Sequence, residues 1–196
     1  MGKEKKNIGL LFGSFNPIHL GHMIIAEFMV NNTDLDETWF VVSPHNPLKK
    51  KETLLADIHR LAMVRIAVEN DSRFRVCDIE FKMPKPSYTI HTLTYLSEKY
   101  PDYQFTLIAG TDILPTFNKW KNYEKILDNY HIYIYPRPGK QSRQFLDNTN
   151  VQLIKAPMIE ISSSNIRQYI REGKKPVYML LPKVWQYIQE MHFYKK

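Results

Sequence analysis

Short apolar runs alternate along this chain with longer segments in which apolar residues recur at helical spacing. The first run, Ile8–Phe12, does not alternate with polar positions, which predicts a strand buried on both faces. Leu20–Val30 follows it with apolar residues at helical spacing. The same patterns predict strands at 8–12, 38–42, 74–77, 104–109, 131–135 and 151–154, and helices at 20–30, 57–69, 89–100, 163–172 and 183–192.

The repeated order of strand and helix indicates an α/β fold with a parallel sheet and helices on both faces. We expect a single doubly wound domain over residues 1–196, with a small helical part from about residue 160 onward. In such sheets, ligands bind at the carboxyl ends of the strands, where the strand order reverses. The loops that directly follow strands are therefore the candidate site, at 13–22, 43–52, 78–90, 110–120 and 136–143.

The loop after the first strand carries two histidines in place of a glycine-rich phosphate loop. The seven glycines form neither a G-x-G-x-x-G nor a G-x-x-x-x-G-K-[ST] pattern. His19 and His22 are three residues apart at the start of a predicted helix, so their rings share a face at the end that attracts anions. Gly21 between them lets a ligand approach the backbone. Because the pair directly follows a buried strand, we favour anion binding.

Two plainer interpretations of the histidine pair stand beside this one. One histidine could be a surface residue and the other a helix cap. A zinc pair is a further alternative, but the spacing is not the i, i+4 spacing of helical zinc ligands and no cysteine supports it.

Three serines precede the helix predicted at 163–172. A single serine there would be an ordinary N-cap. Ser162–Ser164 together with Arg167, which follows within the first turn, supply hydroxyls, backbone N–H groups and a guanidinium for phosphate oxygens. The sequence therefore predicts a polyphosphate-binding helix start.

Charge and cysteine content narrow the class of protein. The net charge of +7 suits anionic partners, but the basic residues are scattered along the chain. An RNA-binding module, the alternative from another class, is expected to have a dense basic stripe with interleaved aromatic residues. Cys77 is the only cysteine, and neither a signal peptide nor 18 consecutive apolar residues is found. We expect a cytoplasmic protein without a membrane span or a nucleic-acid partner.

Gly13–His22 resembles the G-x-F-x-P-x-H-x-G-H signature of the nucleotidylyltransferase superfamily. More narrowly, the chain resembles the bacterial nicotinate-nucleotide adenylyltransferases. Ile161–Arg167 is similar to the I-S-S-T-x-I-R motif of that family, with Ser164 in place of Thr. Other segments of that family are matched in order, at Pro86–Leu93, Gly110–Asp112, Asn118–Trp120, Arg137–Gly139 and Leu181–Ile188. The resemblance covers about the whole chain.

The resemblance implies a Rossmann-like fold and the transfer of the adenylyl group of ATP to nicotinate mononucleotide, with release of pyrophosphate, in NAD biosynthesis. It implies His19, His22 and Arg167 as catalytic residues. The implied ATP-binding residues are Gly13, Ser14, Phe15, His19, His22, Gly110, Asp112, Ser163, Ser164 and Arg167. The implied mononucleotide-binding residues are Asn46, Lys50, Ser87, Tyr88, Thr89, Trp120 and Arg137.

The implied chemistry requires no metal site on the protein. A mononucleotide phosphate is already an anionic nucleophile, so positioning and charge stabilisation suffice. We expect Mg²⁺ to arrive with ATP, largely hydrated and bound to phosphate. A homo-oligomer remains open.

Two departures from the family pattern leave points open. Phe12 stands where the family has the first glycine of its G-G-[ST]-F segment. The loop Ser43–Lys51 lacks the double proline and the histidine of the family's P-N-x-x-P-P-H-K segment. The sequence therefore does not identify which of the lysines at 49–51 contacts phosphate. The alternative is that this loop is solvated and binds no phosphate. Thr89 as an ordinary helix cap and Trp120 as a core residue also remain alternatives.

The substrate that accepts the nucleotidyl group also has alternatives. They are nicotinamide mononucleotide, phosphopantetheine and a CTP-dependent substrate.

Overall fold

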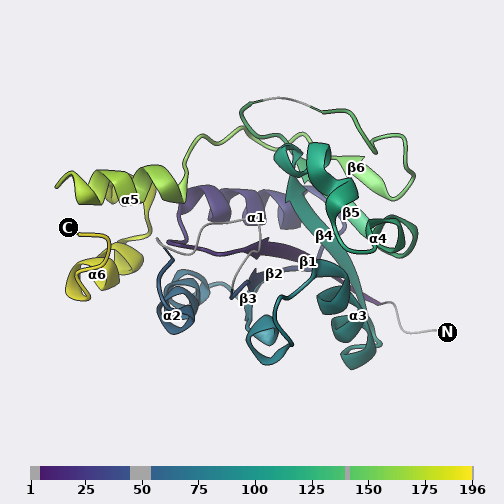
Figure 1. Cartoon of the computed structure of the whole chain (residues 1–196), viewed down its shortest axis with the longest axis horizontal. Coiled ribbons are helices and arrows are strands. Elements are labelled where there is room, and N and C mark those ends of the chain that lie inside the picture. The colour runs from purple at the N-terminus through teal and green to yellow at the C-terminus, as the bar shows by residue number, and fades with distance from the viewer. Residues whose placement is uncertain (1–4, 45–53, 140–141, 196) are drawn as a thin grey trace.

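One parallel sheet organises the fold (Figure 1). The computed structural model describes residues 5–44, 54–139 and 142–195. Its strands are β1 (Lys6–Gly13), β2 (Glu37–Val42), β3 (Phe74–Cys77), β4 (Tyr103–Gly110), β5 (His131–Tyr135) and β6 (Val151–Leu153). They pair in the order β3-β2-β1-β4-β5-β6, and every neighbouring pair is parallel. The order reverses between β1 and β4, so the crevice beyond their carboxyl ends is the expected ligand site.

Helices connect the strands and cover both faces of the sheet. The α-helices are α1 (Leu20–Asn32), α2 (Asp57–Val68), α3 (Thr89–Lys99), α4 (Tyr123–Asn129), α5 (Ser163–Arg171) and α6 (Pro182–Glu190). The connections between the described elements contain the 3₁₀ helices η2 (Ile79–Lys82), η3 (Thr111–Lys119) and η4 (Val177–Met179). The Rossmann-like, doubly wound α/β fold expected from the sequence is confirmed.

The alternation of side chains along each strand builds two hydrophobic cores. On β1, Leu10 packs into the core shared with α3, α4 and η3, whereas Leu11 packs into the core shared with α1, α2, α5 and α6. Successive side chains of a strand point to opposite faces, so a strand with helices on both sides is apolar at every position. This is why Ile8–Phe12 showed no polar alternation.

The short helices η2, η3, η4 and α4 were not expected from the sequence. Residues 110–120 were expected as a loop, but most of them form η3, which contains Pro115. The helix α4 was not expected. It has seven residues and buries only Ile126 and Leu127, which is too little apolar repetition to indicate a helix. It begins after Asn122, whose backbone is left-handed with a φ of 52°.

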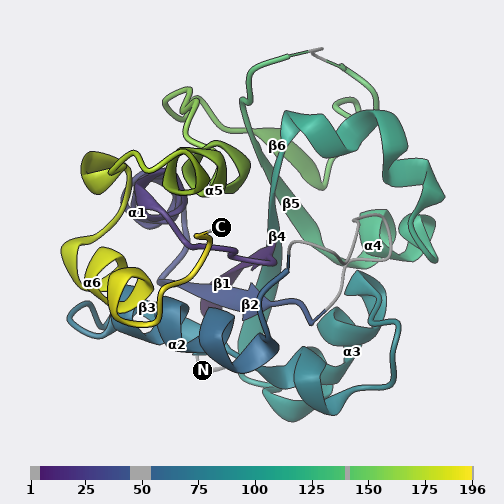
Figure 2. The same cartoon turned by 60° about the vertical axis from the view of Figure 1, so that its left-hand side comes forward.

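The C-terminal helices α5 and α6 lie together at one end of the molecule (Figures 1 and 2). Ile166 and Ile170 of α5 and Val184 and Ile188 of α6 join the same core as α1 and α2. The packing holds the start of α5 against the loop that follows β1, as the hydrogen bonds below show.

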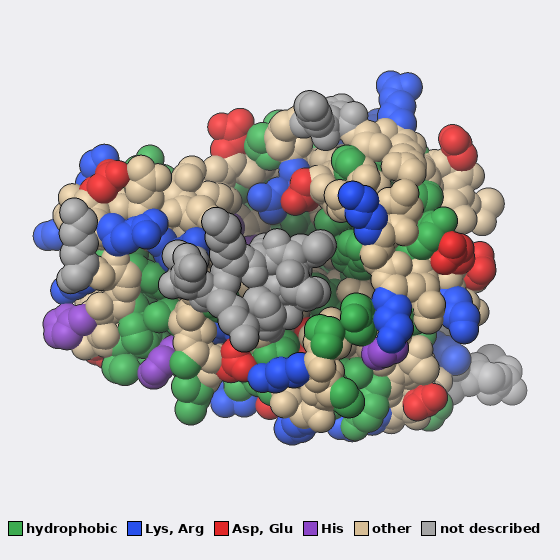
Figure 3. All heavy atoms as spheres, in the orientation of Figure 1, with side chains coloured by type: hydrophobic (Ala, Val, Ile, Leu, Met, Phe, Trp, Pro, Cys, Tyr) green, Lys and Arg blue, Asp and Glu red, His purple; other side chains and the backbone are tan. Residues whose placement is uncertain are grey.

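Charged side chains of both signs occur on the face of the molecule seen in Figure 3. On the face seen in Figure 3, Lys and Arg side chains are spread from the region of α5 to that of α3, with acidic groups among them. The scattered basic residues of the sequence thus remain scattered on this face, which does not favour the RNA-binding alternative. Within residues 5–44, 54–139 and 142–195, no helix is both long and apolar enough to cross a membrane.

Candidate active site

The loop after β1 turns sharply at Phe15. This residue is 2% exposed and has a φ of 43°, a left-handed conformation that is an outlier for an aromatic residue and that concentrates at functional sites. A Cβ atom added to Gly13 would lie 2.8 Å from the Phe15 ring, so the turn requires glycine at position 13. Phe12 packs against the core on the α3 side. The turn therefore accommodates a phenylalanine where the family has its first glycine.

The two histidines stack on each other at the start of α1. His19 is the residue before the helix, and its ring centroid lies 3.7 Å from that of His22, with 28° between the planes. The backbone N–H of His19 donates to Nδ1 of His22 at 3.3 Å. Because Nδ1 accepts in this contact, Nε2 is the ring nitrogen of His22 that can donate to a ligand. The edge of the Phe15 ring contacts the His22 ring, with 5.0 Å between centroids.

Burial keeps His19 neutral in this structure. The side chain is 5% exposed, and desolvation followed by the charge of Arg137 lowers its pKa to about 3. Its Nδ1 atom is buried and has no hydrogen-bond partner among the residues that the structure describes. An unpaired buried nitrogen at the start of a helix is a position where a ligand would restore the missing interaction. His19 is thus arranged to act as a neutral hydrogen-bonding group.

A narrow pocket opens beside the histidines. It is lined by His19, Gly21, His22, Ile25, Tyr135, Pro136, Arg137, Ile159 and Ile161. A Cβ atom on Gly21 would lie 3.0 Å from Ile159 and 3.1 Å from the His19 ring, so a larger residue there would crowd the ring and the pocket wall. The pocket therefore joins the start of α1 to the end of β5 and to the segment that leads into α5.

Arg137 anchors the far wall of this pocket. Its backbone N–H donates to Oγ1 of Thr111 at 3.0 Å, and its Nε lies 3.7 Å from Oδ1 of Asp112. A Cβ atom on Gly110 would lie 2.4 Å from both Asp112 and Arg137. The sequence assigned Gly110 and Asp112 to ATP and Arg137 to the mononucleotide. The structure brings all three together on the histidine side of the site.

The serine-rich helix start divides its hydroxyls between two tasks. Ser162 is the N-cap of α5, and its Oγ accepts from the backbone N–H of Asn165 at 3.1 Å. The ordinary capping role thus belongs to Ser162. Ser163 and Ser164, the two serines assigned to ATP, do not cap the helix.

Ser163 and Arg167 reach the histidine loop. Oγ of Ser163 donates to the backbone oxygen of Pro17 at 2.8 Å, and Nη1 of Arg167 donates to the backbone oxygen of Asn16 at 2.8 Å. Nη2 of Arg167 lies 3.4 Å from Oγ of Ser164, and its Nε is buried without a partner in the described part of the chain. The structure therefore brings the α5 start and the histidine loop into one site.

The C-terminal segment adds a residue that the sequence analysis missed. Oη of Tyr194 donates to Oδ1 of Asn16 at 2.8 Å, and burial raises the pKa of this tyrosine. The backbone N–H of Leu55 donates to the same oxygen at 3.3 Å. No motif marked Tyr194 or Asn16. Asn16 stands at an unspecified position of the G-x-F-x-P-x-H-x-G-H signature.

The segments expected to hold the mononucleotide lie around the start of α3. Tyr88 precedes the helix and Thr89 is its first residue, and the described residues supply no side-chain cap hydrogen bond there. Oγ of Ser87 donates to the buried Glu80 at 3.0 Å. The ammonium of Lys121 lies 4.6 Å from the centroid of the Tyr88 ring, which brings the loop after η3 beside this helix start.

Trp120 is half-buried and rests on Phe117, with 5.2 Å between ring centroids. The expectation of a partly exposed tryptophan is confirmed, and the buried part of Trp120 packs against the core on the α3 side. Asn46 and Lys50, expected at the mononucleotide, lie outside the described residues, as does the whole lysine cluster at 49–51.

Among residues 5–44, 54–139 and 142–195, no three His, Cys, Asp or Glu side chains form a group that could hold a metal ion. What the site offers instead is a set of hydrogen-bond donors and guanidinium groups. Such a set suits the binding of phosphates.

Comparison with known proteins identifies the class first. The Cytidylyltransferase-like family model matches residues 10–169, from β1 into α5, and so includes both the histidine loop and the serine-rich helix start.

Individual relatives narrow the class. The chain is 52% identical over 191 residues to a protein of Flavobacterium psychrophilum named "Probable nicotinate-nucleotide adenylyltransferase", covering 96% of this chain and 99% of the relative. A Bacteroides thetaiotaomicron protein with the same name is 45% identical over 187 residues, covering 95% and 93%. The chain belongs to the cytidylyltransferase-like family and, within it, to the nicotinate-nucleotide adenylyltransferases.

The fold is also that of a solved structure. Plasmodium falciparum nicotinic acid mononucleotide adenylyltransferase complexed with NaAD superimposes with a TM-score of 0.81, at 24% identity, covering 96% of this chain and 97% of the other. At this identity the likeness concerns the fold.

Proposed function

We propose that this protein transfers the adenylyl group of ATP to nicotinate mononucleotide, forming nicotinate adenine dinucleotide and pyrophosphate as a step of NAD biosynthesis. A phosphate oxygen of the mononucleotide attacks the α-phosphorus of ATP. The bond from that phosphorus to the oxygen that bridges it to the β-phosphate breaks, and pyrophosphate leaves with that oxygen. The relatives named for this reaction, at up to 52% identity over nearly the full chain, support the proposal.

The observation that carries the proposal is the meeting of the histidine loop with α5. Two polyanions must be held together for in-line attack, and charge on the departing pyrophosphate must be stabilised. In our proposal His22 and the neutral His19 donate hydrogen bonds to ATP phosphates, and Ser163, Ser164 and Arg167 hold the β- and γ-phosphates. Mg²⁺ enters as part of the substrate, bound to ATP, so the protein need not supply a carboxylate cluster.

The adenosine part of ATP is assigned to the ends of β1 and β4. Gly13, Ser14 and Phe15 offer backbone groups at the sharp turn, and Gly110 and Asp112 lie at the neighbouring strand end. Arg137 contacts Asp112 and lies beside the histidines, so we propose that it serves the phosphates between the two substrates.

The acceptor is assigned to the start of α3 and the loop after η3. Tyr88 and Thr89 lie where free backbone N–H groups favour an anion, which suits the carboxylate of nicotinate more than the neutral amide of nicotinamide. Trp120 offers a ring face for the pyridine, and Ser87 lies next to Tyr88. Asn46 and Lys50 complete the proposed set. We also propose the cytoplasm as the compartment, since the single cysteine, Cys77, is buried as a thiol.

Pyrophosphate release tests the proposal. The purified protein is mixed with ATP and Mg²⁺ and with nicotinate mononucleotide, nicotinamide mononucleotide or no acceptor. We expect release with nicotinate mononucleotide, a much smaller rate with the amide and none without acceptor. Equal rates with both acceptors would show that the protein does not recognise the carboxylate of nicotinate. No release with either would contradict the function.

A further inference from the structure

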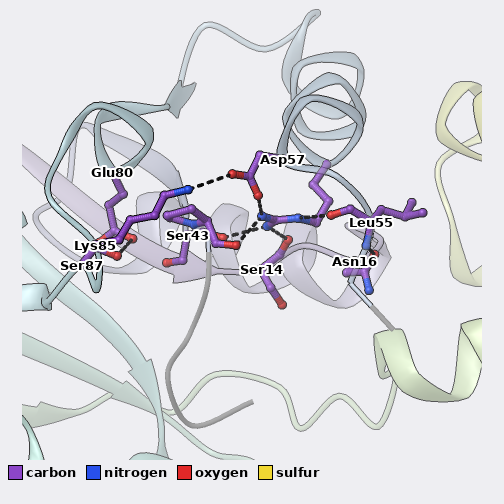
Figure 4. Close-up of polar contacts among 10 residues, drawn as sticks. Ser14, Asn16, Ser43, Leu55, Asp57, Glu80, Lys85 and Ser87 are labelled. Carbon is purple, nitrogen blue, oxygen red and sulfur yellow. Dashed lines mark hydrogen bonds and ion pairs between the residues drawn. The ribbon is translucent and has the colours of Figure 1, made fainter. Parts of the chain in front are cut away.

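Arg60 is a completely buried arginine in the first turn of α2, with 0% of its surface exposed. It contacts Ser14 and Ser43, which lie in the loops that follow β1 and β2 (Figure 4). The guanidinium of Arg60 donates five hydrogen bonds. Nε donates to the backbone oxygen of Leu55 at 3.1 Å, and Nη1 donates to the backbone oxygens of Ser14 at 2.6 Å and Ser43 at 2.8 Å. Nη2 donates to the backbone oxygen of Pro44 at 3.0 Å and to Oδ1 of Asp57 at 2.6 Å.

These five hydrogen bonds use every N–H group that a guanidinium possesses. Arg60 therefore has no donor left for a phosphate, and its charge already faces a carboxylate. Unlike Arg167, whose Nε is unpaired in the described chain, Arg60 is not arranged to bind substrate. Any effect on catalysis must pass through the groups that it holds.

The groups held by Arg60 belong to the two loops that frame the switch point of the sheet. Ser14 lies in the turn between β1 and His19, and Ser43 and Pro44 directly follow β2. The backbone N–H of Ser43 also donates to the oxygen of Gly13 at 2.9 Å. A planar fork that donates to both loops at once fixes their separation as well as their orientation.

Asp57 extends this connection to the acceptor side. While Oδ1 accepts from Arg60, Oδ2 lies 3.9 Å from Nζ of Lys85, two residues before Ser87 (Figure 4). Lys85 is 63% exposed, so this outer ion pair is weak. The strong part of the network is Arg60 with its carbonyl acceptors, and Asp57 orients the guanidinium.

We propose that Arg60 is a positioning residue that sets the distance between the ATP-binding turn after β1 and the loop after β2. The inference rests on the proposed adenylyl transfer. Without the fork, both loops still exist, but the attacking phosphate and the α-phosphorus are no longer held in line. Misalignment lowers kcat more than it weakens the binding of either substrate.

The test compares Arg60→Lys with Arg65→Lys, a matched variant on the same helix whose side chain is 62% exposed and lies 3.7 Å from Asp78. Lysine keeps the charge but has three N–H groups and no planar fork, so at least two acceptors lose their donor. Folding is followed by thermal unfolding, and kinetics are measured well below the midpoint of each variant. For Arg60→Lys we expect kcat to fall by roughly tenfold to a hundredfold, with both KM values changed by less than about threefold. Arg65→Lys is expected to match the wild type.

A purely structural Arg60 gives a different pattern. The midpoint then falls while kcat of the folded enzyme stays at the wild-type value, and this result would overturn the inference. If Arg60→Lys does not fold, Asp57→Asn, which removes only the orienting charge, is measured in its place. It is expected to lower kcat by roughly threefold to tenfold, and an unchanged kcat would overturn the inference equally. Because all rates are referred to the wild type, an inactive wild type contradicts the proposed function, whereas an active wild type with an equally active variant contradicts only the role of Arg60.

Discussion

The guanidinium of Arg167 donates a 2.8 Å hydrogen bond to the backbone oxygen of Asn16, a residue 151 positions earlier in the chain. Asn16 lies three residues before His19, so this contact brings the α5 start to the histidine loop. Ser163 makes a parallel contact to Pro17 at 2.8 Å. One site therefore combines residues from both ends of the sequence.

His22→Ala tests whether the histidine pair stabilises charge during the reaction. We expect kcat to fall by roughly a hundredfold or more, with a much smaller rise in KM for ATP, because the hydrogen bond strengthens as charge develops on the phosphates. His131→Ala, at the exposed amino end of β5, serves as the control and is expected to be neutral. If kcat of His22→Ala equals that of the wild type, His22 has no part in the mechanism.

Trp120→Ala tests the stacking role of the half-buried tryptophan. We expect KM for the pyridine mononucleotide to rise by roughly tenfold, because the ring face that holds the base is lost. KM for ATP is expected to stay near its wild-type value, and Trp120→Phe should recover most of the loss. A KM for the mononucleotide that does not change in Trp120→Ala would show that the base does not stack there.

Most of the fold was predicted from the sequence because strands and helices each leave a local pattern of apolar residues. Apolar runs without alternation indicated buried parallel strands, and the repeated helices between them indicated the doubly wound order. The helix α4 was missed because its seven residues bury only two apolar side chains. Nothing local distinguishes so short a helix from a turn.

The sequence indicated those parts of the candidate site that lie in contiguous motifs. The histidines and the serine-led helix were found because each motif is contiguous. Tyr194 and Arg60 act through contacts with Asn16 and Ser14, far from them in the chain, and such pairing leaves no local pattern. For Arg60 one sign was present, since it adjoins Leu61 and precedes Val64 by four residues, on the apolar face of its helix.

The buried His19 predicts a pH dependence of stability. Its imidazole has an ordinary pKa of 6.5 in the unfolded chain and about 3 in the folded protein. Between these values the unfolded state binds more protons, so the free energy of unfolding falls as the pH is lowered from about 6.5, by roughly 1.4 kcal/mol per pH unit. Above pH 6.5 this contribution is constant.

Urea unfolding between pH 7 and pH 5 measures this effect in the ligand-free protein. His19→Gln, which cannot titrate, is expected to lose less stability over the interval, by about 2 kcal/mol relative to the wild type. Parallel pH profiles of the two proteins would show that His19 is not held neutral by the fold.

Tyr194→Phe tests the hydrogen bond from the C-terminal segment to the histidine loop. The variant removes only the hydroxyl that donates to Asn16, so we expect kcat to fall by roughly twofold to tenfold without unfolding. Tyr187→Phe is the matched control, because its hydroxyl lies 3.0 Å from Nδ1 of His59 rather than at the loop. Equal losses in both variants would indicate a general effect on the packing of this segment.

In the proposed reaction, one triphosphate contacts both the histidine pair and α5. A crystal structure with a non-hydrolysable ATP analogue and Mg²⁺ measures this directly. We expect phosphate oxygens within hydrogen-bond distance of His19 or His22 and, in the same molecule, of Ser163 or Arg167. An analogue bound with its phosphates away from either group would contradict the account.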